Sequence, residues 1–352
     1  MSNGKPSQAP IAQVYNPVEF QAEVSLATSA FENLLGPNMQ WKDFGETDGV
    51  RVFRGTPPIL PGRDAVPGRS VLPLSKSEVE IPDSNPVELL ACLHQTSYRC
   101  LFQPRIRTAY YLRRFGMFHN QFYAVLAFGQ DFQARDFVGV QYARFFDEQG
   151  NEIGHPKQDS PRIDLIFASV DDAKVPPMDG NIVRARYWHA GLRFTKTEKG
   201  TLVQYISQID YGKPIPAYIY KVMWLEVPLT IGRLKEAHRL IGFPPYVLDP
   251  TYTIVMQLQS FDVDTRAVSI SALVVRAGIF TIVLDSKRMY KEGVFFSDRS
   301  GPAIKSIEIE EKDGNIQVKT KESAVGHAFE LIFRACDQEV AEVDQPDDTK
   351  DW

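Results

Sequence analysis

The sequence has few cysteines, little net charge and no long apolar run. Its three cysteines are Cys92, Cys100 and Cys336, and their spacing matches no metal site. So small a number excludes a disulfide scaffold, favours a reducing compartment and predicts three small, buried, apolar side chains. The formal net charge of -5 for 352 residues argues against a nucleic-acid partner and against purely electrostatic binding to acidic membranes.

No apolar stretch reaches the roughly 18 residues that a membrane-spanning helix requires. The opening residues, MSNGKPSQAP, contain no apolar core of the length found in signal peptides. We therefore expect a cytoplasmic protein whose membrane association is peripheral and mainly apolar. Residues 1–16 are predicted to be a flexible N-terminus, and the acidic residues 337–352 a disordered tail.

Catalytic and metal-binding motifs are missing as well. The six histidines show no HxH or HxxxH spacing, and there is no GxSxG motif and no glycine-rich phosphate loop. The sequence therefore predicts no metal and no cofactor, and it gives no sign of an enzyme. A catalytic set assembled from residues distant in sequence is left as an alternative.

What the sequence does contain is a long series of strand-like segments. Between residues 107 and 210, runs rich in Tyr, Phe, Val and Ile are separated by short turn-like segments such as DEQGNE and EKG. Strands connected this closely predict an antiparallel sheet. Before them we expect a helix over 17–35, a tight turn at Asp48-Gly49, a strand near 70–74 and a helix over 85–93 with Asn85 as its N-cap.

The segment from Pro214 to Gly242 is predicted to be one long helix that Pro228 kinks. Its first half is apolar nearly all the way round, which is typical of a helix that covers an apolar interior or touches lipid. A helix packed on an antiparallel sheet gives an α+β domain over residues 17–245. The predicted apolar stripe of this helix consists of Tyr218, Val222, Leu225 and Leu229.

Further strands are expected after this helix. The Pro-rich segment GFPPYVLDP, residues 242–250, is predicted to be a linker. Residues 251–334 contain more strand-like runs, and the alternation in SIEIEEKDGNIQVKT around Asp313-Gly314 predicts a β-hairpin. We expect these strands to form a small β-sandwich over residues 250–336.

Three segments, in a fixed order, resemble one known family. WKDFGETDGVRVF (41–53) looks like the opening of a START (StAR-related lipid transfer) domain, and RDFV (135–138) resembles the family's best short signature. The stretch 183–239 is similar to its closing strands and helix, including a Val-Pro step like that of the phosphatidylcholine-transfer branch. The resemblance covers residues 20–245. It implies a helix-grip fold, in which a curved antiparallel sheet wraps the last helix and encloses a tunnel for one lipid.

The resemblance also implies a gate to this tunnel. The gate would be made by the loop of residues 170–181 together with the helix over 217–241, with the kink at Pro228 as its hinge. The loop has an apolar tip without a core of its own to enter, so we expect the tip to contact a membrane. The tip consists of Val175, Pro176, Pro177 and Met178.

Ligand contacts follow from the same resemblance. Phe137 and Trp188 match positions where phosphatidylcholine-binding relatives place aromatic residues of a choline cage, and aromatic faces attract quaternary ammonium groups. A further cage position is Ala124 here, which departs from the pattern, and both aromatic residues are equally well explained as core. The region where those relatives bind lipid phosphate contains Arg99, Arg105 and Arg107, for which a solvated basic face is the other interpretation.

The strand pattern supplies other candidates. Arg184 and Arg186 share one strand face with Trp188, a combination typical of a site for an anionic or zwitterionic headgroup. Arg135 and Asp136 point to opposite faces, so a structural ion pair explains them better than a shared ligand contact. The predicted ligand-binding set is Phe137, Trp188, Arg186, Arg184, Tyr123, Arg135, Tyr218, Met223 and Trp224.

These expectations define a lipid-binding or lipid-transfer protein that holds one hydrophobic ligand, such as a phospholipid, a sterol or a carotenoid, and contacts membranes transiently. Two alternatives stay open. The same fold can host an enzyme, for example a cyclase or a hydrolase, if polar residues converge on the cavity. Alternatively, the protein is a ligand-gated adaptor that binds a protein partner through its C-terminal β domain.

Overall fold

The computed structural model describes residues 15–16, 18–56, 69–129, 132–176, 181–298, 307–312 and 314–336. Its first part contains one large sheet. The strands of this sheet are β1 (Trp41–Thr47), β2 (Val50–Gly55), β3 (Ser75–Pro82), β4 (Ile106–Arg114), β5 (His119–Leu126), β6 (Ala134–Phe146), β7 (Glu152–Ile153), β8 (Arg162–Ser169), β9 (Ile182–Arg184), β10 (Arg186–Lys196) and β11 (Gly200–Asp210). Their order is β1-β2-β3-β11-β10-β8-β6-β5-β4, with the short β7 and β9 both paired to β6. Only β9 pairs in parallel, so the predicted antiparallel sheet is confirmed.

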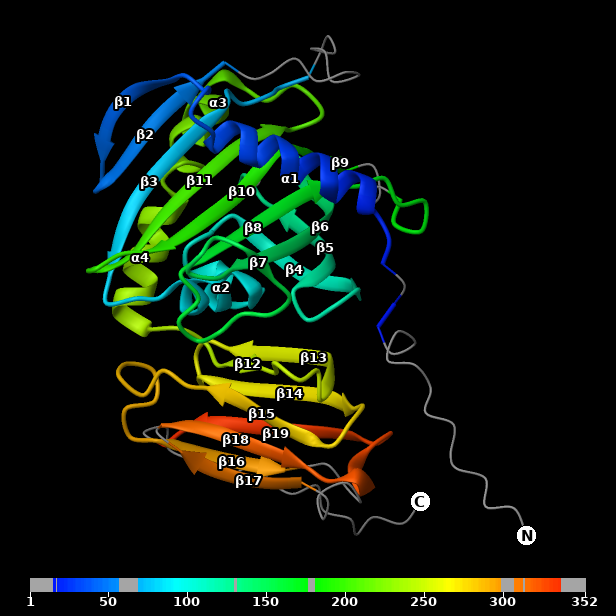
Figure 1. The fold of residues 1–352 in the computed structure, drawn as a ribbon. Coiled ribbons are helices and arrows are strands. Elements are labelled where there is room, and N and C mark those ends of the chain that lie inside the picture. The colour runs from blue at the N-terminus through cyan, green and yellow to red at the C-terminus, as the bar shows by residue number, and fades with distance from the viewer. Residues whose placement is uncertain are drawn as a thin grey trace.

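Helices cover both faces of this sheet (Figure 1). α1 (Gln21–Leu35) lies across the outer face. The inner face is covered by α2 (Pro86–His94), the 3-10 turn η2 (Tyr98–Leu101), α3 (Ala217–Glu226) and α4 (Thr230–Ile241). Alternate side chains of a strand point to opposite faces of the sheet. In β8, Leu165 and Phe167 enter the inner core, whereas Ile166 packs under α1.

Local chemistry explains where these elements begin. Asp48 and Gly49 have φ angles of 51° and 73°, the positive values that a two-residue hairpin turn needs between β1 and β2. Asn85 accepts hydrogen bonds from the first turn of α2 while Glu88 reaches back to the backbone N–H of Asn85, a capping box. The strand predicted near 70–74 forms only an isolated antiparallel bridge, between Val71 and Asp210. β3 begins only at Ser75, because Pro73 has no N–H to donate to a ladder.

The predicted long helix is two helices. α3 ends at Glu226, α4 begins at Thr230, and Pro228 lies between them. The carbonyl of Pro228 accepts a hydrogen bond of 2.8 Å from Ser77 Oγ on β3. This bond ties the segment between α3 and α4 to the sheet. The chain therefore changes direction at Pro228 instead of curving along a continuous helix.

The apolar stripe predicted for this helix is also wrong. Tyr218, Val222 and Leu225 are 67%, 47% and 50% exposed and face solvent, whereas the fourth residue, Leu229, is half-buried against the core. The inward stripe is Ile219 and Met223, which are buried against the sheet. In a helix that is apolar nearly all round, both stripes have helical spacing, and the sequence pattern alone does not tell them apart.

The C-terminal residues form two four-stranded antiparallel sheets. One contains β12 (Tyr246–Leu248), β15 (Gly278–Val283), β18 (Asn315–Thr320) and β17 (Ile307–Lys312), in this order. The other contains β13 (Ile254–Asp262), β14 (Ala267–Val274), β19 (Ala328–Ala335) and β16 (Val294–Asp298). Phe280 from the first sheet and Phe329 from the second stack with ring centroids 5.8 Å apart. The hairpin predicted for β17 and β18 is confirmed, although Asp313 lies outside the described residues.

Residues 242–250 are not the predicted linker. They contain β12, which pairs with β15 over its whole length. Tyr246 and Val247 are 6% and 4% exposed, so this segment belongs to the packed interior. Its two successive prolines, Pro244 and Pro245, precede the strand and do not interrupt it. The proline content of the segment therefore wrongly predicted a linker.

A chain of polar contacts joins α4 to the segment after β15. Asp285, 1% exposed, accepts hydrogen bonds from Phe243 N at 3.1 Å and from Arg288 Nε at 3.2 Å. Arg288 Nη1 lies 3.3 Å from Nδ1 of His238 on α4. His238 Nε2 in turn lies 3.3 Å from Glu88 Oε2 on α2. These contacts hold α4 between α2 and the C-terminal sheets (Figure 1).

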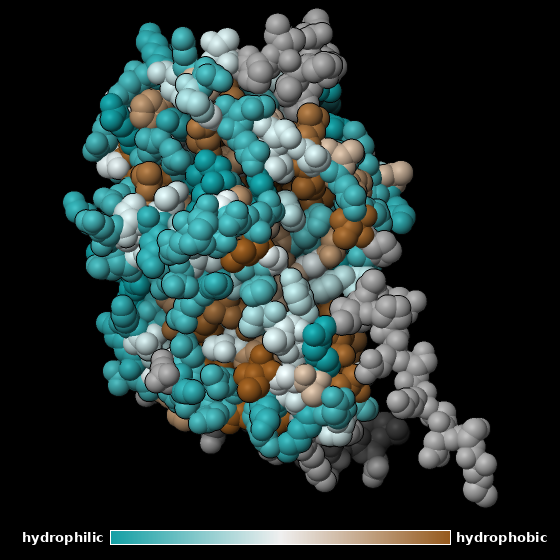
Figure 2. All heavy atoms as spheres, viewed as in Figure 1, coloured by the Kyte–Doolittle hydropathy of each residue, from teal (hydrophilic) through white to brown (hydrophobic). Residues whose placement is uncertain are grey.

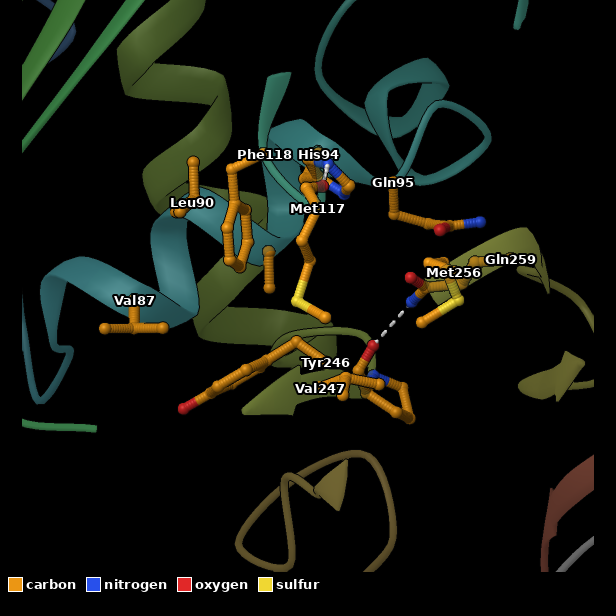
Figure 3. A pocket seen from close by; sticks show the side chains of 12 residues that line it. Val87, Leu90, His94, Gln95, Met117, Phe118, Tyr246, Val247, Met256 and Gln259 are labelled. Carbon is orange, nitrogen blue, oxygen red and sulfur yellow. Dashed lines mark hydrogen bonds between the residues drawn. The ribbon is translucent and has the colours of Figure 1, made fainter. Parts of the chain in front are cut away.

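A small pocket of about 20 Å³, room for about one water molecule, lies at the same interface (Figure 3). His94 and Met117 line it from the first part of the chain, and Tyr246 and Met256 from the second. His94 Nε2 lies 3.1 Å from Met117 O. Burial, helped by the charge of Arg114, lowers the pKa of His94 from 6.5 to about 3.

This depressed pKa predicts a pH-dependent stability. Above pH 6.5, His94 is neutral in both states and its contribution is fully present. As the pH falls from 6.5 toward 3, His94 binds a proton in the unfolded chain but stays neutral in the folded protein. The free energy of unfolding therefore falls. We expect the free energy of unfolding to fall by about 1.5 kcal/mol more between pH 6.5 and 5 in the natural protein than in His94→Gln. Urea titrations at both pH values measure this, and equal losses would contradict the assignment.

The molecular surface is ordinary on the face that carries α1. Figure 2 shows mostly hydrophilic residues there, with apolar residues in small separate patches. Within the described ranges, no helix has both the length and the apolar character to cross a membrane. Cys92 is buried and Cys336 half-buried, but Cys100 is exposed against expectation, since Tyr98 and Arg99 take the inward positions of η2.

Candidate ligand-binding cavity

A cavity of about 70 Å³ lies between the inner face of the sheet and the helices α3 and α4, and a smaller space of about 30 Å³ adjoins it toward α2. The sheet contributes residues of β5, β6, β10 and β11, and η2 with the start of β4 closes one side. The larger cavity is lined by Arg99, Gln103, Arg105, Ile106, Phe122, Ala124, Leu126, Phe137, Tyr187, Tyr205, Ile209, Tyr211, Met223, Glu226, Val227, Thr230 and Arg233.

Aromatic rings of the sheet line this cavity and the smaller space beside it, which is the one that Phe167 lines. Phe137 on β6 and Tyr187 on β10 stack with centroids 4.7 Å apart and an interplanar angle of 28°. Phe122 and Phe167 meet edge to face at 6.0 Å, and Phe167 is also 6.0 Å from Tyr187. These four rings come from neighbouring strands, so the sheet itself fixes their positions.

Arg99 is the most unusual residue of the lining. It is only 7% exposed, and its Nε donates a hydrogen bond of 3.1 Å to Gln103 Oε1. Its guanidinium lies 5.6 Å from the ring centroid of Phe167. Among the described residues, no carboxylate lies within ion-pair distance of it. A buried cation without a counter-ion is costly, because its charge is desolvated and only partly compensated.

Three phenols line the same cavity as this cation. Burial is the main cause that raises the pKa values of Tyr187, Tyr205 and Tyr211, so all three are neutral hydrogen-bond donors near pH 7. The hydroxyl of Tyr211 is buried and has no hydrogen-bond partner in the described structure. An unsatisfied buried hydroxyl in a cavity wall is available to a ligand or to water.

An ion pair closes the mouth of the cavity. Glu226, the last residue of α3, accepts bonds from Arg105 Nε at 2.8 Å and Arg105 Nη2 at 2.7 Å. The backbone carbonyl of Glu226 also accepts a bond of 3.0 Å from Arg233 on α4. Burial lowers the pKa of Arg233, although it stays cationic at neutral pH. The C-terminal end of α3 is thus fastened both to the start of β4 and to α4.

Two residues of the predicted ligand-binding set line the cavity, Phe137 and Met223. Tyr123 does not: it lies on the outer face, where its hydroxyl is 3.3 Å from Asp136. Tyr218 faces solvent. Trp188 and Trp224 are half-buried outside the lining, and the neighbour of Trp188, Tyr187, occupies the inward position instead.

The predicted arginines of the strands are held by protein groups outside the cavity. Arg135 is 1% exposed and donates to the carbonyls of Tyr211 and Gln133 at 2.8 Å and 2.6 Å. Arg184 pairs with Asp136 at 2.8 Å, which agrees with the structural interpretation of that carboxylate. Arg186 pairs with Asp171 on the surface.

The predicted gate loop is anchored along its described part. Asp172 accepts a hydrogen bond from Gln121 on β5 and pairs with Arg113 on the edge strand β4. Val175 is half-buried against the outer apolar cluster, so it is not the free tip that its sequence predicts. Pro176 is exposed, whereas Pro177 and Met178 lie outside the described residues.

The cavity residues that sequence reasoning left out of its binding set are Arg99 and the ring-bearing Phe122, Tyr187, Tyr205 and Tyr211. A signal for Arg99 does exist. The sequence contains no acidic residue between Glu88 and Asp131, so an arginine in that segment has no counter-ion close by in sequence. An apolar surrounding such as YRCLF then indicates burial rather than a solvated face.

The sequence matches no protein-family model and no curated protein. The solved structure of human STARD10 matches 66% of this chain and 83% of its own, with 18% identity and a TM-score of 0.46. The lipid transfer and protein localization domain of human StarD13 covers 62% of this chain and 96% of its own, with 17% identity and a TM-score of 0.45.

Human StAR-related lipid transfer protein 5 covers 62% of this chain and 97% of its own, with 16% identity and a TM-score of 0.45. All three are less than 20% identical to this chain, so the function proposed below depends on the chain's own residues. Solved structures similar to this chain thus include StAR-related lipid transfer proteins, the family that its three sequence segments resemble.

Proposed function

We propose that this protein binds one lipid in the cavity and transfers it between membranes, with an anionic or zwitterionic headgroup against Arg99. The observation that carries the proposal is the buried Arg99, which has no carboxylate partner among the described residues and lines a cavity whose sheet side is aromatic and aliphatic. A phosphate or carboxylate group would offset the cost of this buried charge. Of the ligand classes considered above, a phospholipid fits this wall better than a sterol or a carotenoid, because only it carries an anionic group.

Ligand entry requires the cavity to expand. Its volume of about 70 Å³ is room for only a few water molecules, far less than a lipid needs. We infer that α3 is the part that moves. α4 is held by the contacts of His238 with Arg288 and Glu88, and the break is held by Ser77. Rotation of α3 about Pro228 would open the cavity once the bond between Arg105 and Glu226 is released. In this proposal the loop of residues 170–181 has the smaller part in the gate.

The outward face of α3 is the proposed membrane contact. Its exposed apolar residues, Tyr218, Val222 and Leu225, are at i, i+4 and i+7 and so form one stripe. When α3 meets the membrane, the apolar surface of this stripe is removed from water. We infer that this gain in free energy favours the open position of α3. A cytoplasmic location with peripheral membrane association is consistent with this arrangement.

Replacing Val222 and Leu225 by Asp should weaken binding to phosphatidylcholine vesicles by about 100-fold or more, since each buried side chain contributes about 1.5 kcal/mol or more and the two losses add. Vesicle sedimentation measures the effect. The matched control is Leu240→Asp, because Leu240 is a 66% exposed leucine on α4, away from the stripe. Equal losses of vesicle binding in both variants would show that any added surface charge weakens binding, and that the stripe on α3 has no special part in it.

The direct test of the function is native mass spectrometry of the purified protein, followed by organic extraction of any bound molecule. A one-to-one adduct identified as a phospholipid or fatty acid supports the proposal. Extraction of a neutral sterol or carotenoid would keep lipid binding but remove the role of Arg99. A protein that binds no added lipid at all would favour the enzyme or adaptor alternative.

The adaptor alternative has one specific observation in its favour. β16 is an edge strand of the C-terminal sheets, and its Phe295 and Phe296 are 58% and 52% exposed. We propose that residues 250–336 form a β-sandwich, and an exposed apolar edge of such a domain can pair with an extended peptide of a partner. A partner whose affinity changes with lipid occupancy would establish this role beside lipid transfer.

A further inference from the structure

Cations and aromatic rings gather where the β1–β2 hairpin meets α3. Lys42 and Arg54 are cross-strand partners, and they lie 5.6 Å and 5.7 Å from the ring centroid of Phe44. Arg54 also stacks 4.5 Å from the ring of Trp224 and donates a bond of 3.0 Å to the carbonyl of Trp224. Phe44 meets Trp224 edge-on at 6.2 Å. These four side chains, named here the hairpin–α3 cluster, are in continuous contact.

The two cations of the hairpin–α3 cluster have no acidic partner among the described residues. The next arginine on β2, Arg51, pairs with Asp43 on β1, so acidic groups are available on the hairpin but not to this cluster. Burial lowers the pKa of Arg54 to about 10, which leaves it protonated at neutral pH. The cluster therefore presents uncompensated positive charge on a protein whose net charge is -5.

Two hydrogen-bond donors inside the cluster are also unsatisfied. Arg54 Nε and Trp224 Nε1 are buried and have no acceptor in the described structure. Most buried donors in proteins are paired, so two unpaired ones in contacting side chains need an explanation. An acceptor-rich anion, such as a phosphate group, would satisfy both the donors and the charge.

The surroundings of the cluster indicate where such an anion would come from. Trp224 belongs to α3, whose exposed stripe of Tyr218, Val222 and Leu225 is the proposed membrane contact. Lys221, also exposed and without an ion pair among the described residues, lies one helical turn before Trp224. Tryptophan and basic side chains beside an apolar stripe are typical of the membrane interface, where phosphate groups lie.

We propose that the hairpin–α3 cluster binds the phosphate of an anionic phospholipid at the membrane surface and so directs α3 toward acidic membranes. This inference rests on the proposed function, because it takes α3 as the element that docks. It adds a second lipid contact, outside the cavity, that recognises the membrane rather than the transported ligand. A local positive site on a negatively charged protein also orients the molecule during approach, with α3 leading.

The experiment compares binding to vesicles of phosphatidylcholine alone and of phosphatidylcholine with phosphatidylglycerol, at about 0.1 M salt. Replacing both Lys42 and Arg54 by Gln should weaken binding to the acidic vesicles by about 10- to 30-fold, because each basic side chain near an acidic surface contributes about one tenfold factor or less. Binding to neutral vesicles should change little. The matched control replaces Lys287 and Lys291, exposed lysines of the turn segment between β15 and β16, by Gln and should bind as the natural protein does.

The variant Trp224→Phe tests the indole N–H separately, since it keeps an aromatic ring under Arg54. It should lose part of the preference for acidic vesicles, and near-ultraviolet circular dichroism checks that it is folded. The inference is overturned if the double variant retains full binding to acidic vesicles, or if the natural protein binds neutral and acidic vesicles equally. Cavity occupancy, measured by lipid extraction, separates these results from a failure of the proposed function, which would leave the natural protein without any ligand.

Discussion

Arg99→Met will lower the affinity for a fluorescent fatty acid or phospholipid by about 10- to 100-fold, the effect expected when hydrogen bonds to a charged group are lost. The ligand-free variant should be at least as stable as the natural protein. The reason is that Arg99 is 7% exposed and has no carboxylate partner among the described residues, so its removal eliminates the cost of a desolvated charge. Displacement titrations and urea denaturation give the two quantities independently.

The control for this prediction is Arg107→Met, which removes an exposed arginine of β4 and should leave both quantities unchanged. An uncharged analogue of the ligand, with an alcohol in place of the acid, provides a second check. The natural protein and Arg99→Met should bind this analogue with similar affinity. If the variant lost affinity for charged and uncharged ligands alike, Arg99 would be a structural residue of the wall rather than the headgroup contact.

Gly242→Ala will destabilise the protein by about 3 to 4 kcal/mol, because two costs coincide at this position. Gly242 has a φ of 94°, a conformation that an L residue adopts only with strain. A Cβ there would lie 1.9 Å from Asp285 Oδ2, so Asp285 would have to leave its hydrogen bonds to Phe243 and Arg288. Thermal and urea denaturation measure the loss.

Gly45→Ala separates the two costs. Gly45 has a similar φ of 86°, but a Cβ there would have nothing within 4 Å. Its substitution should therefore cost only the backbone strain, about 1 kcal/mol. Losses of equal size in the two variants would mean that the contact between Asp285 and α4 contributes little to stability.

Much of the fold could be predicted because local chemistry specifies it. The turn at Asp48-Gly49 needs positive φ angles, and Asn85 with Glu88 forms a capping box whatever lies around it. The strands between 107 and 210 carry β-branched and aromatic residues and are separated by turn residues. β12 was missed because a strand of only three residues, directly after two prolines, has no pattern of its own.

The cavity was harder to predict because the choice of face is not local. Strands buried on both sides read as apolar throughout, so nothing in the pattern of β5 indicates that Phe122 points inward and Tyr123 outward. The same ambiguity put Tyr218 on the wrong side of α3. The lack of acidic residues near Arg99 in the sequence indicates its burial, but the residues that share the cavity with it come from distant segments of the chain.

The hydrogen bonds around Asp285 have a consequence for how the chain can be divided. Tyr98 of η2 donates its hydroxyl to the carbonyl of Gly242, and Phe243 follows directly as a buried core residue. A cut after residue 245 would remove Asp285 and Arg288 and leave the end of α4 uncovered. The part of the chain up to residue 245 is therefore expected not to fold on its own, and the whole chain should melt in one cooperative transition. Ligand binding near α3 would then protect even the distant β-strands from proteolysis.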